Sequence, residues 1–230
     1  MARPRASGSS LLRPPLLVLL LTALEGLGCL APVAFGFNPV PTDVPPLFDV
    51  PVWSLATLNA DGETTNLNLL TYASPVSIRP DRQYALGLFK QTLTYENLAR
   101  GDGQLFVLQL LTERHIPLVR ILGGTSGRDG DKMRACTQME PGLAPIDLEG
   151  LECQGGGRRL PMVLPGCAHY LVLSTSGDLI DGGFHDTAIC RVEQMLKRDE
   201  EYEANSEPYL STGRLRELGI ITEAGRIADE

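Results

Sequence analysis

Apolar and polar positions alternate along several short stretches of this chain, and the pattern predicts β-strands. Val52–Leu58 alternates with a period of two, and Thr64–Leu70 is a second strand-like run. The Asp61-Gly62 pair between them is typical of a hairpin turn. A third strand is expected at Gln83–Phe89. A fourth, Gln104–Leu111, is apolar on both faces, which indicates a central position in a sheet.

Helical patterns are few in the part of the chain that follows. A short helix is expected at about Thr94–Arg100, with Gly101 suited to end it. Two more strands are predicted at Ala168–Ser174 and Thr187–Met195. Several strands joined by hairpins, with few helices, favour an all-β barrel.

Two regions give weaker patterns. The glycine-rich stretch 121–161 reads as an irregular excursion between strands, either a functional insertion or a partly helical segment. Residues 197–230 are expected to form a charged, helical C-terminal tail. Within it, Leu196–Ala204 is expected to begin helical, and Leu210–Ile227 carries apolar residues near helical spacing.

The N-terminus has the pattern of a cleavable targeting sequence, assigned to residues 1–37. Arginines precede the apolar run Leu16–Leu24, which is shorter than the ~20 residues of a membrane span. Cleavage is expected at Ala34-Phe35 or after Gly28. A signal peptide followed by phenylalanine resembles the bipartite presequence that directs proteins to secondary plastids, and secretion or residence in the endomembrane lumen is the alternative. A proline-rich lead-in, 38–51, follows.

Charge and cysteine content narrow the possible partners. The net charge is −8, and the first 37 residues are net positive, so the remainder is more acidic still. This balance argues against nucleic acid or an anionic membrane as a partner of the mature chain. Outside the leader, the four cysteines have no CxxC spacing, and no metal site is expected. They are interpreted as buried or half-buried thiols, and three pairings stay open if they are oxidised; the residues are Cys136, Cys153, Cys167 and Cys190.

Four polar stretches carry the candidate chemistry. In chain order they are Asn68…Thr71-Tyr72-Ala73-Ser74-Pro75-Val76-Ser77, Lys90-Gln91-Thr92-Leu93-Thr94…Asn97, Ser126-Gly127-Arg128-Asp129-Gly130-Asp131-Lys132-Met133 and Gly183-Phe184-His185-Asp186. With this order and spacing, residues 50–195 resemble the flavin reductase-like family. The resemblance implies a mainly β, FMN-binding split barrel over 52–196. It also implies a homodimer with FMN near the subunit interface.

The first two stretches are the expected FMN site. A flavin ring is flat and apolar with a polar edge, so small residues and backbone groups suit it. A phosphate needs positive charge, hydroxyls and free N–H groups such as those at a helix start. By resemblance the cofactor-binding residues are Asn68, Thr71, Tyr72, Ala73, Ser74, Lys90, Gln91, Thr92, Thr94 and Asn97. The alternatives are a polar strand end before Pro75, and a helix cap at Thr92 or Thr94.

His185 is the candidate catalytic residue. Many family members carry Gly-Asp-His at this place, whereas this chain has Phe184 where the acid is expected. A role in orienting NADH or NADPH and a plain packing or surface role are therefore both open. His115 and His169 are expected to be core or surface residues. The Asp131-Lys132 pair is interpreted as an exposed, loop-ordering ion pair.

Two functions follow from the resemblance. The first is an oxidoreductase that passes hydride from NAD(P)H to flavin, with an unknown electron acceptor. The second is a non-catalytic FMN carrier or sensor, which the Phe184 departure favours. A haem-binding barrel is a third possibility, but it would need an axial ligand, and none of the three histidines is suitably flanked.

Overall fold

A computed structural model describes residues 41–43, 46–101, 103–148, 158–197 and 207–228. The leader and Cys153 lie outside the described residues. Residues 46–230 form one unit, and it is described here by itself. Within the described residues, no helix is long and apolar enough to cross a membrane.

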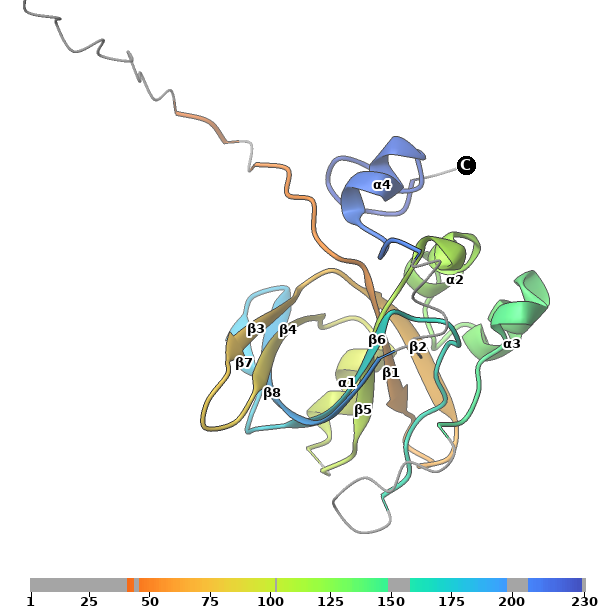
Figure 1. Cartoon of the computed structure of the whole chain (residues 1–230). Coiled ribbons are helices and arrows are strands. Elements are labelled where there is room, and N and C mark those ends of the chain that lie inside the picture. Colours follow the sequence, from red (N-terminus) through yellow and green to blue (C-terminus); the bar gives the residue numbers. More distant parts are fainter. Residues whose placement is uncertain (1–40, 44–45, 102, 149–157, 198–206, 229–230) are drawn as a thin grey trace, which may run out of the picture. The chain divides into compact units, whose positions relative to one another are not determined.

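The fold is a mainly antiparallel sheet curled into a half-barrel, with a few short helices (Figure 1). In chain order the strands are β1 Trp53–Leu58, β2 Thr65–Leu70, β3 Ala73–Ser77, β4 Gln83–Phe89, β5 Phe106–Leu110, β6 His169–Thr175, β7 Ile180–Gly182 and β8 His185–Lys197. The helices are α1 Leu93–Ala99, η1 Glu113–Leu118, α2 Val119–Gly124, α3 Lys132–Met139, η2 Pro141–Leu143 and α4 Thr212–Glu217.

The strands are hydrogen-bonded in the order β2-β1-β5-β6-β8-β4-β3, with β7 paired to β8. The β1–β2 hairpin closes through Asp61, whose carboxylate accepts hydrogen bonds from the N–H groups of Glu63 and Thr64. Gly62 has a φ of +69°, a conformation that glycine adopts at little cost. The predicted hairpin, the strand at Gln83–Phe89 and the central fourth strand are confirmed.

Successive side chains of β1 and β5 point to opposite faces of the sheet and pack into two separate apolar clusters. Leu55 and Leu108 join a cluster inside the half-barrel, where Leu98 of α1 packs against them. Ala56 and Val107 point the other way, toward a second cluster built with η1, α2, α3 and the chain after residue 207. β5 is buried on both faces, which explains why its sequence is apolar apart from Gln109.

The structure corrects several boundaries. The 121–161 excursion is partly helical, because it holds the end of α2 together with α3 and η2. Leu196 and Lys197 belong to β8, so the helix expected to begin there is wrong at those positions, and the rest of that segment lies outside the described residues. The helix expected across Leu210–Ile227 is only the six-residue α4. Strands β3 and β7 were not predicted as such.

Candidate functional site

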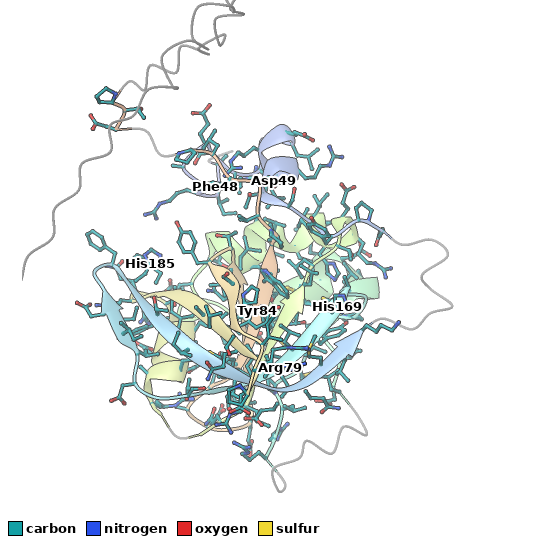
Figure 2. All side chains as sticks on the ribbon, turned by 60° about the vertical axis from the view of Figure 1, so that its left-hand side comes forward. Phe48, Asp49, Arg79, Tyr84, His169 and His185 are labelled. Atoms are coloured by element: carbon teal, nitrogen blue, oxygen red, sulfur yellow. The ribbon has the colours of Figure 1, made fainter. Side chains whose placement is uncertain are left out.

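Three aromatic rings meet where β2, β4 and β8 end or begin. Tyr72 follows β2, and its carbonyl accepts a hydrogen bond from the Gly87 N–H at 2.8 Å. The Tyr72 and His185 ring centroids are 5.5 Å apart in an edge-to-face arrangement, and those of Phe89 and His185 are 5.2 Å apart. The first and last polar stretches of the sequence therefore come together. Figure 2 shows His185 well apart from His169.

Gly87 is required for this approach. A Cβ at residue 87 would lie 2.9 Å from the Tyr72 Cβ, closer than side-chain atoms normally come. The missing side chain lets the backbone after β2 lie directly against β4. The Tyr72 side chain itself is 63% exposed, so its ring offers a flat face beside His185.

Lys90 follows β4 and is held by two carboxylates. Its Nζ lies 2.5 Å from Asp181 Oδ1 and 2.9 Å from Asp186 Oδ1. The hydroxyl of Tyr95 donates to the other oxygen of Asp186 at 2.8 Å. The Lys90 N–H also donates to the Phe184 carbonyl at 3.2 Å. The second polar stretch thus joins the aromatic rings at the start of β8.

The ion pairs determine the protonation states of this network. The bonds to Asp181 and then Asp186 raise the pKa of Lys90 above its usual range. The bond to Lys90 lowers the pKa of Asp186, and the bond to Asp186 raises the pKa of Tyr95. At neutral pH Lys90 is therefore a cation, Asp186 is an anion and Tyr95 is a neutral hydrogen-bond donor.

The threonines and Asn97 after Lys90 have partners within the protein. Thr92 caps α1, since its Oγ1 accepts from the Tyr95 N–H at 3.2 Å. Thr94 is buried and accepts from Asn66 Nδ2 at 2.9 Å. Asn97 is buried and donates to Thr57 Oγ1 at 2.9 Å, which braces α1 against β1. The cap interpretation of Thr92 is confirmed; a direct role of these side chains toward phosphate stays a prediction.

The residues expected along the ring lie on β2 and on the edge strand β3. Asn68 is half-buried on β2, and Thr71 is half-buried between the two strands. Ala73 and Ser74 open β3, which pairs with β4 alone among the described strands. An edge strand presents N–H and C=O groups that are not used by a neighbouring strand. The backbone beside Tyr72 therefore offers donors and acceptors.

The third polar stretch contacts the turn after β4 and the first part of α1. Arg128 donates to the Gln91 carbonyl at 2.6 Å and forms an ion pair with Glu96 at 2.5 Å. A Cβ on Gly127 would lie 2.1 Å from Asn66 Oδ1, so a side chain at residue 127 would displace the buried Asn66 amide. The segment 127–133 faces the β1–β2 turn and the start of β2 across a cleft of about 540 Å³.

Lys132 corrects the prediction of an exposed ion pair. Its side chain is buried, and its Nζ donates to the Leu122 carbonyl at 2.7 Å, in the last turn of α2. Desolvation lowers the pKa of Lys132 to about 8. Asp131 instead caps α3 by accepting from the Arg134 N–H at 3.0 Å. Lys132 orders this segment as a C-terminal cap for α2.

The other two histidines and the described cysteines lie in the core or at the surface, apart from the network around Lys90. His115 is buried, its Nε2 lies 3.0 Å from the Pro165 carbonyl, and desolvation lowers its pKa to about 4. His169 is exposed. Cys136, Cys167 and Cys190 are buried thiols, as predicted. No cluster of metal-ligating side chains occurs among the described residues.

Comparison with solved structures identifies the architecture. Flavoredoxin from Methanosarcina acetivorans superposes with a TM-score of 0.55 at 16% identity, over 74% of this chain and 80% of that one. The FMN-binding protein from Thermus thermophilus superposes with a TM-score of 0.52 at 16% identity, over 83% of this chain and 85% of that one. The chain has the flavin reductase-like split-barrel fold. The predicted fold class is thereby confirmed.

The split barrel also matches a longer chain from Sinorhizobium meliloti 1021, with a TM-score of 0.52 and 16% identity. The match covers 72% of this chain but only 47% of that one, so this chain spans about half the length of that relative. No protein-family model and no curated protein sequence matches the chain. At such low identity, the structural likeness establishes the fold alone.

Two members of the site, Asp181 and Tyr95, are not among the residues predicted from sequence, and Asp186 is present in the fourth stretch without an assigned role. These three residues complete the network around Lys90, although Asp181 and Lys90 are 91 residues apart in sequence. The signal present in the sequence was Asp181-Gly182-Gly183, which is typical of a tight turn and would place an acid beside His185. Its partner could be found only once the pairing of β4 with β8 was known.

Proposed function

We propose that this split barrel binds FMN at the junction of β3, β4 and β8. The observation that carries the proposal is that Tyr72, Lys90 and His185, from three separate polar stretches, meet at one place. The names of the Methanosarcina and Thermus structures, a flavoredoxin and an FMN-binding protein, support the same ligand class.

The ring part of FMN fits what the site offers. Its polar edge of carbonyls and an N–H can pair with backbone groups of the edge strand at Ala73 and Ser74. The exposed ring of Tyr72 and the half-buried His185 supply flat, partly apolar surface beside that strand. Aromatic rings favour offset or edge-to-face contacts with a flat ligand. We assign the ring and ribityl chain to Asn68, Thr71, Tyr72, Ala73 and Ser74.

The phosphate part would use Lys90 and the turn after it. Lys90 supplies the positive charge. The Thr92 N–H already donates to the Phe89 carbonyl at 3.1 Å, so the Gln91 N–H is the backbone donor we assign to the phosphate. Both cations near this turn already have carboxylate partners: Lys90 has Asp181 and Asp186, and Arg128 has Glu96. A phosphate must therefore compete with carboxylates of the protein, and we expect FMN to exchange rather than to stay permanently bound.

The reaction we propose is hydride transfer from NADH or NADPH to the bound flavin. Flavin supplies the hydride-accepting chemistry, while the protein holds, orients and shields the reactants. His185 would orient the nicotinamide from the Tyr72 side, and Asp186 with Tyr95 would keep Lys90 in position. The electron acceptor is open.

A second candidate function is a flavin carrier or sensor without turnover. Phe184 favours it, because this residue is 81% exposed at the place where the resemblance leads us to expect an acid next to the histidine. A large apolar side chain would cover bound flavin and would not assist a charged dinucleotide. Failure of reduced nicotinamide to bleach a flavin-loaded protein would select this second function.

We also propose that two copies associate through the face that carries the site. Five exposed apolar side chains lie on β3, on β7 and on the turns next to them; they are Tyr72, Val76, Ile78, Ile180 and Phe184. Contiguous apolar surface is typical of an interaction site, and we propose that these side chains are covered in the dimer. Targeting to a plastid, or to the secretory route, remains a proposal that rests on the leader sequence.

The experiment is a visible spectrum of the purified chain with added FMN, followed by anaerobic NADH and NADPH. We expect the flavin band to shift on binding and then to bleach. No change in the FMN spectrum or fluorescence at any protein concentration would overturn the proposal. Binding without bleaching would leave the carrier function standing.

A further inference from the structure

Lys90 has two carboxylate partners of very different character. Asp186 is only 8% exposed at its side chain, and Tyr95 holds its second oxygen. Asp181 is 80% exposed at its side chain and lies on β7, a strand of three exposed residues. Asp186 is thus built into the fold, whereas Asp181 reaches Lys90 from the surface.

Apart from its short ion pair with Lys90, Asp181 has few contacts that hold its side chain in place. Besides Lys90, its carboxylate accepts only a long 3.4 Å hydrogen bond from the Gly183 N–H, among the contacts of the described residues. Ion pairs at exposed positions contribute little to stability, because water and salt screen them and long side chains must be ordered. Opening the Asp181–Lys90 pair would leave Lys90 still neutralised and positioned by Asp186.

We infer that Asp181 occupies the place on Lys90 that the phosphate of a flavin would take, and that it thereby sets the preference between phosphorylated and unphosphorylated flavins. The inference rests on the proposed flavin site. Asp181 competes with the phosphate of FMN for the same ammonium group. Riboflavin has the same ring and ribityl chain but no phosphate, so Asp181 does not oppose it in this way.

The charge count around Lys90 supports this role. One ammonium faces two carboxylates, so the cluster has a net charge of −1 before any ligand arrives. A phosphate brings further negative charge and is accepted only as Asp181 withdraws. Asn in place of Asp181 keeps the size and the turn-forming character of the side chain but removes its charge.

The test measures the dissociation constants of FMN and riboflavin for the native chain, Asp181→Asn and Asp178→Asn. Asp178 is the matched control, since it is exposed in the turn before β7 and lies outside the two ion pairs that Lys90 makes with described residues. We expect Asp181→Asn to tighten FMN binding by about two- to five-fold at low salt. Riboflavin binding should stay unchanged, and Asp178→Asn should resemble the native chain for both ligands.

A second variant shows whether the effect acts through Lys90. In a Lys90→Gln background, Asp181→Asn should no longer alter FMN affinity, and FMN and riboflavin should bind alike. An equal change for both flavins, an equal effect of Asp178→Asn, or a persistent effect without Lys90 would each overturn the inference while leaving the flavin site intact. Failure of every protein, the native chain included, to bind either flavin would overturn the site and the inference together.

Discussion

Replacement of Lys132 by Met tests the buried lysine through the pH dependence of stability. Lys132 is 5% exposed, and its pKa is lowered from the usual 10.5 to about 8 by desolvation. In the unfolded chain the amine regains its ordinary pKa. Between pH 8 and pH 10.5 the unfolded state therefore binds more protons than the folded state, and stability rises with pH.

The magnitude follows from linkage. One pKa unit corresponds to about 1.4 kcal/mol, so the full shift gives an upper limit of about 3 kcal/mol between pH 7 and pH 10.5. Met fills a similar volume and does not titrate. The free energy of unfolding of the native chain should therefore rise, relative to Lys132→Met, by up to about 3 kcal/mol across this range.

Urea unfolding followed by fluorescence of the only tryptophan, the buried Trp53, measures this difference. Burial raises the pKa of Cys136 to about 11 and that of Cys190 to about 12, so these thiols lower stability as pH rises. The effect of Cys190 cancels in the comparison, because this thiol remains in the variant and its pKa depends on burial alone. The charge of Lys132 lowers the pKa of Cys136, so both chains are compared in a Cys136→Ala background. A constant difference between the native chain and Lys132→Met would refute the buried-lysine account.

Two further substitutions test the local structure around the Lys90–Asn97 turn. Gly127→Ala places a Cβ 2.1 Å from Asn66 Oδ1 and should lower the free energy of unfolding in urea by roughly 1–3 kcal/mol. Gly130→Ala is the control, because its Cβ meets nothing within 4 Å and the variant should be nearly as stable as the native chain. Equal effects of the two substitutions would contradict the close contact. Thr92→Ala removes the hydroxyl that accepts from the Tyr95 N–H and should lower the free energy of unfolding by about 1 kcal/mol. Thr92→Ser keeps the hydroxyl and should be as stable as the native chain. Unchanged stability of Thr92→Ala would show that the cap contributes nothing.

The strands that sequence could predict are those with one or two buried faces. β1, β2 and β4 have strand-like patterns, and β5 is apolar apart from Gln109, so the pattern alone predicts them. β3 escaped prediction because it contains Pro75 and is exposed over its middle residues. β7 is three exposed residues whose strand conformation depends entirely on pairing with β8.

The helices of the excursion lack the apolar stripe on which prediction depends. In α3 the buried residues are Lys132 and Cys136, so its inner face looks polar in the sequence. A lysine in that position is read as a surface residue, because burial of an ammonium group is costly. Only the carbonyl of Leu122, brought close by the fold, explains why it is buried.

Individual residues of the candidate site can be predicted from the sequence, but the contacts between them cannot. Lys90 and His185 were singled out from the sequence, and the antiparallel pairing of β4 with β8 brings them together. The carboxylates that surround Lys90 depend on that same pairing, which no local pattern encodes. The sequence therefore indicates Lys90 as a phosphate-binding cation, whereas in the structure Lys90 forms ion pairs with Asp181 and Asp186.

The most direct test of the central claim is a titration of the purified chain with FMN, monitored by the flavin spectrum and fluorescence. The account predicts saturable binding that is lost or strongly weakened when Tyr72 and Lys90 are replaced together by Ala and Gln, with the fold retained by circular dichroism. Unchanged binding in that variant, or no binding by the native chain, would contradict the assignment of this junction as a flavin site.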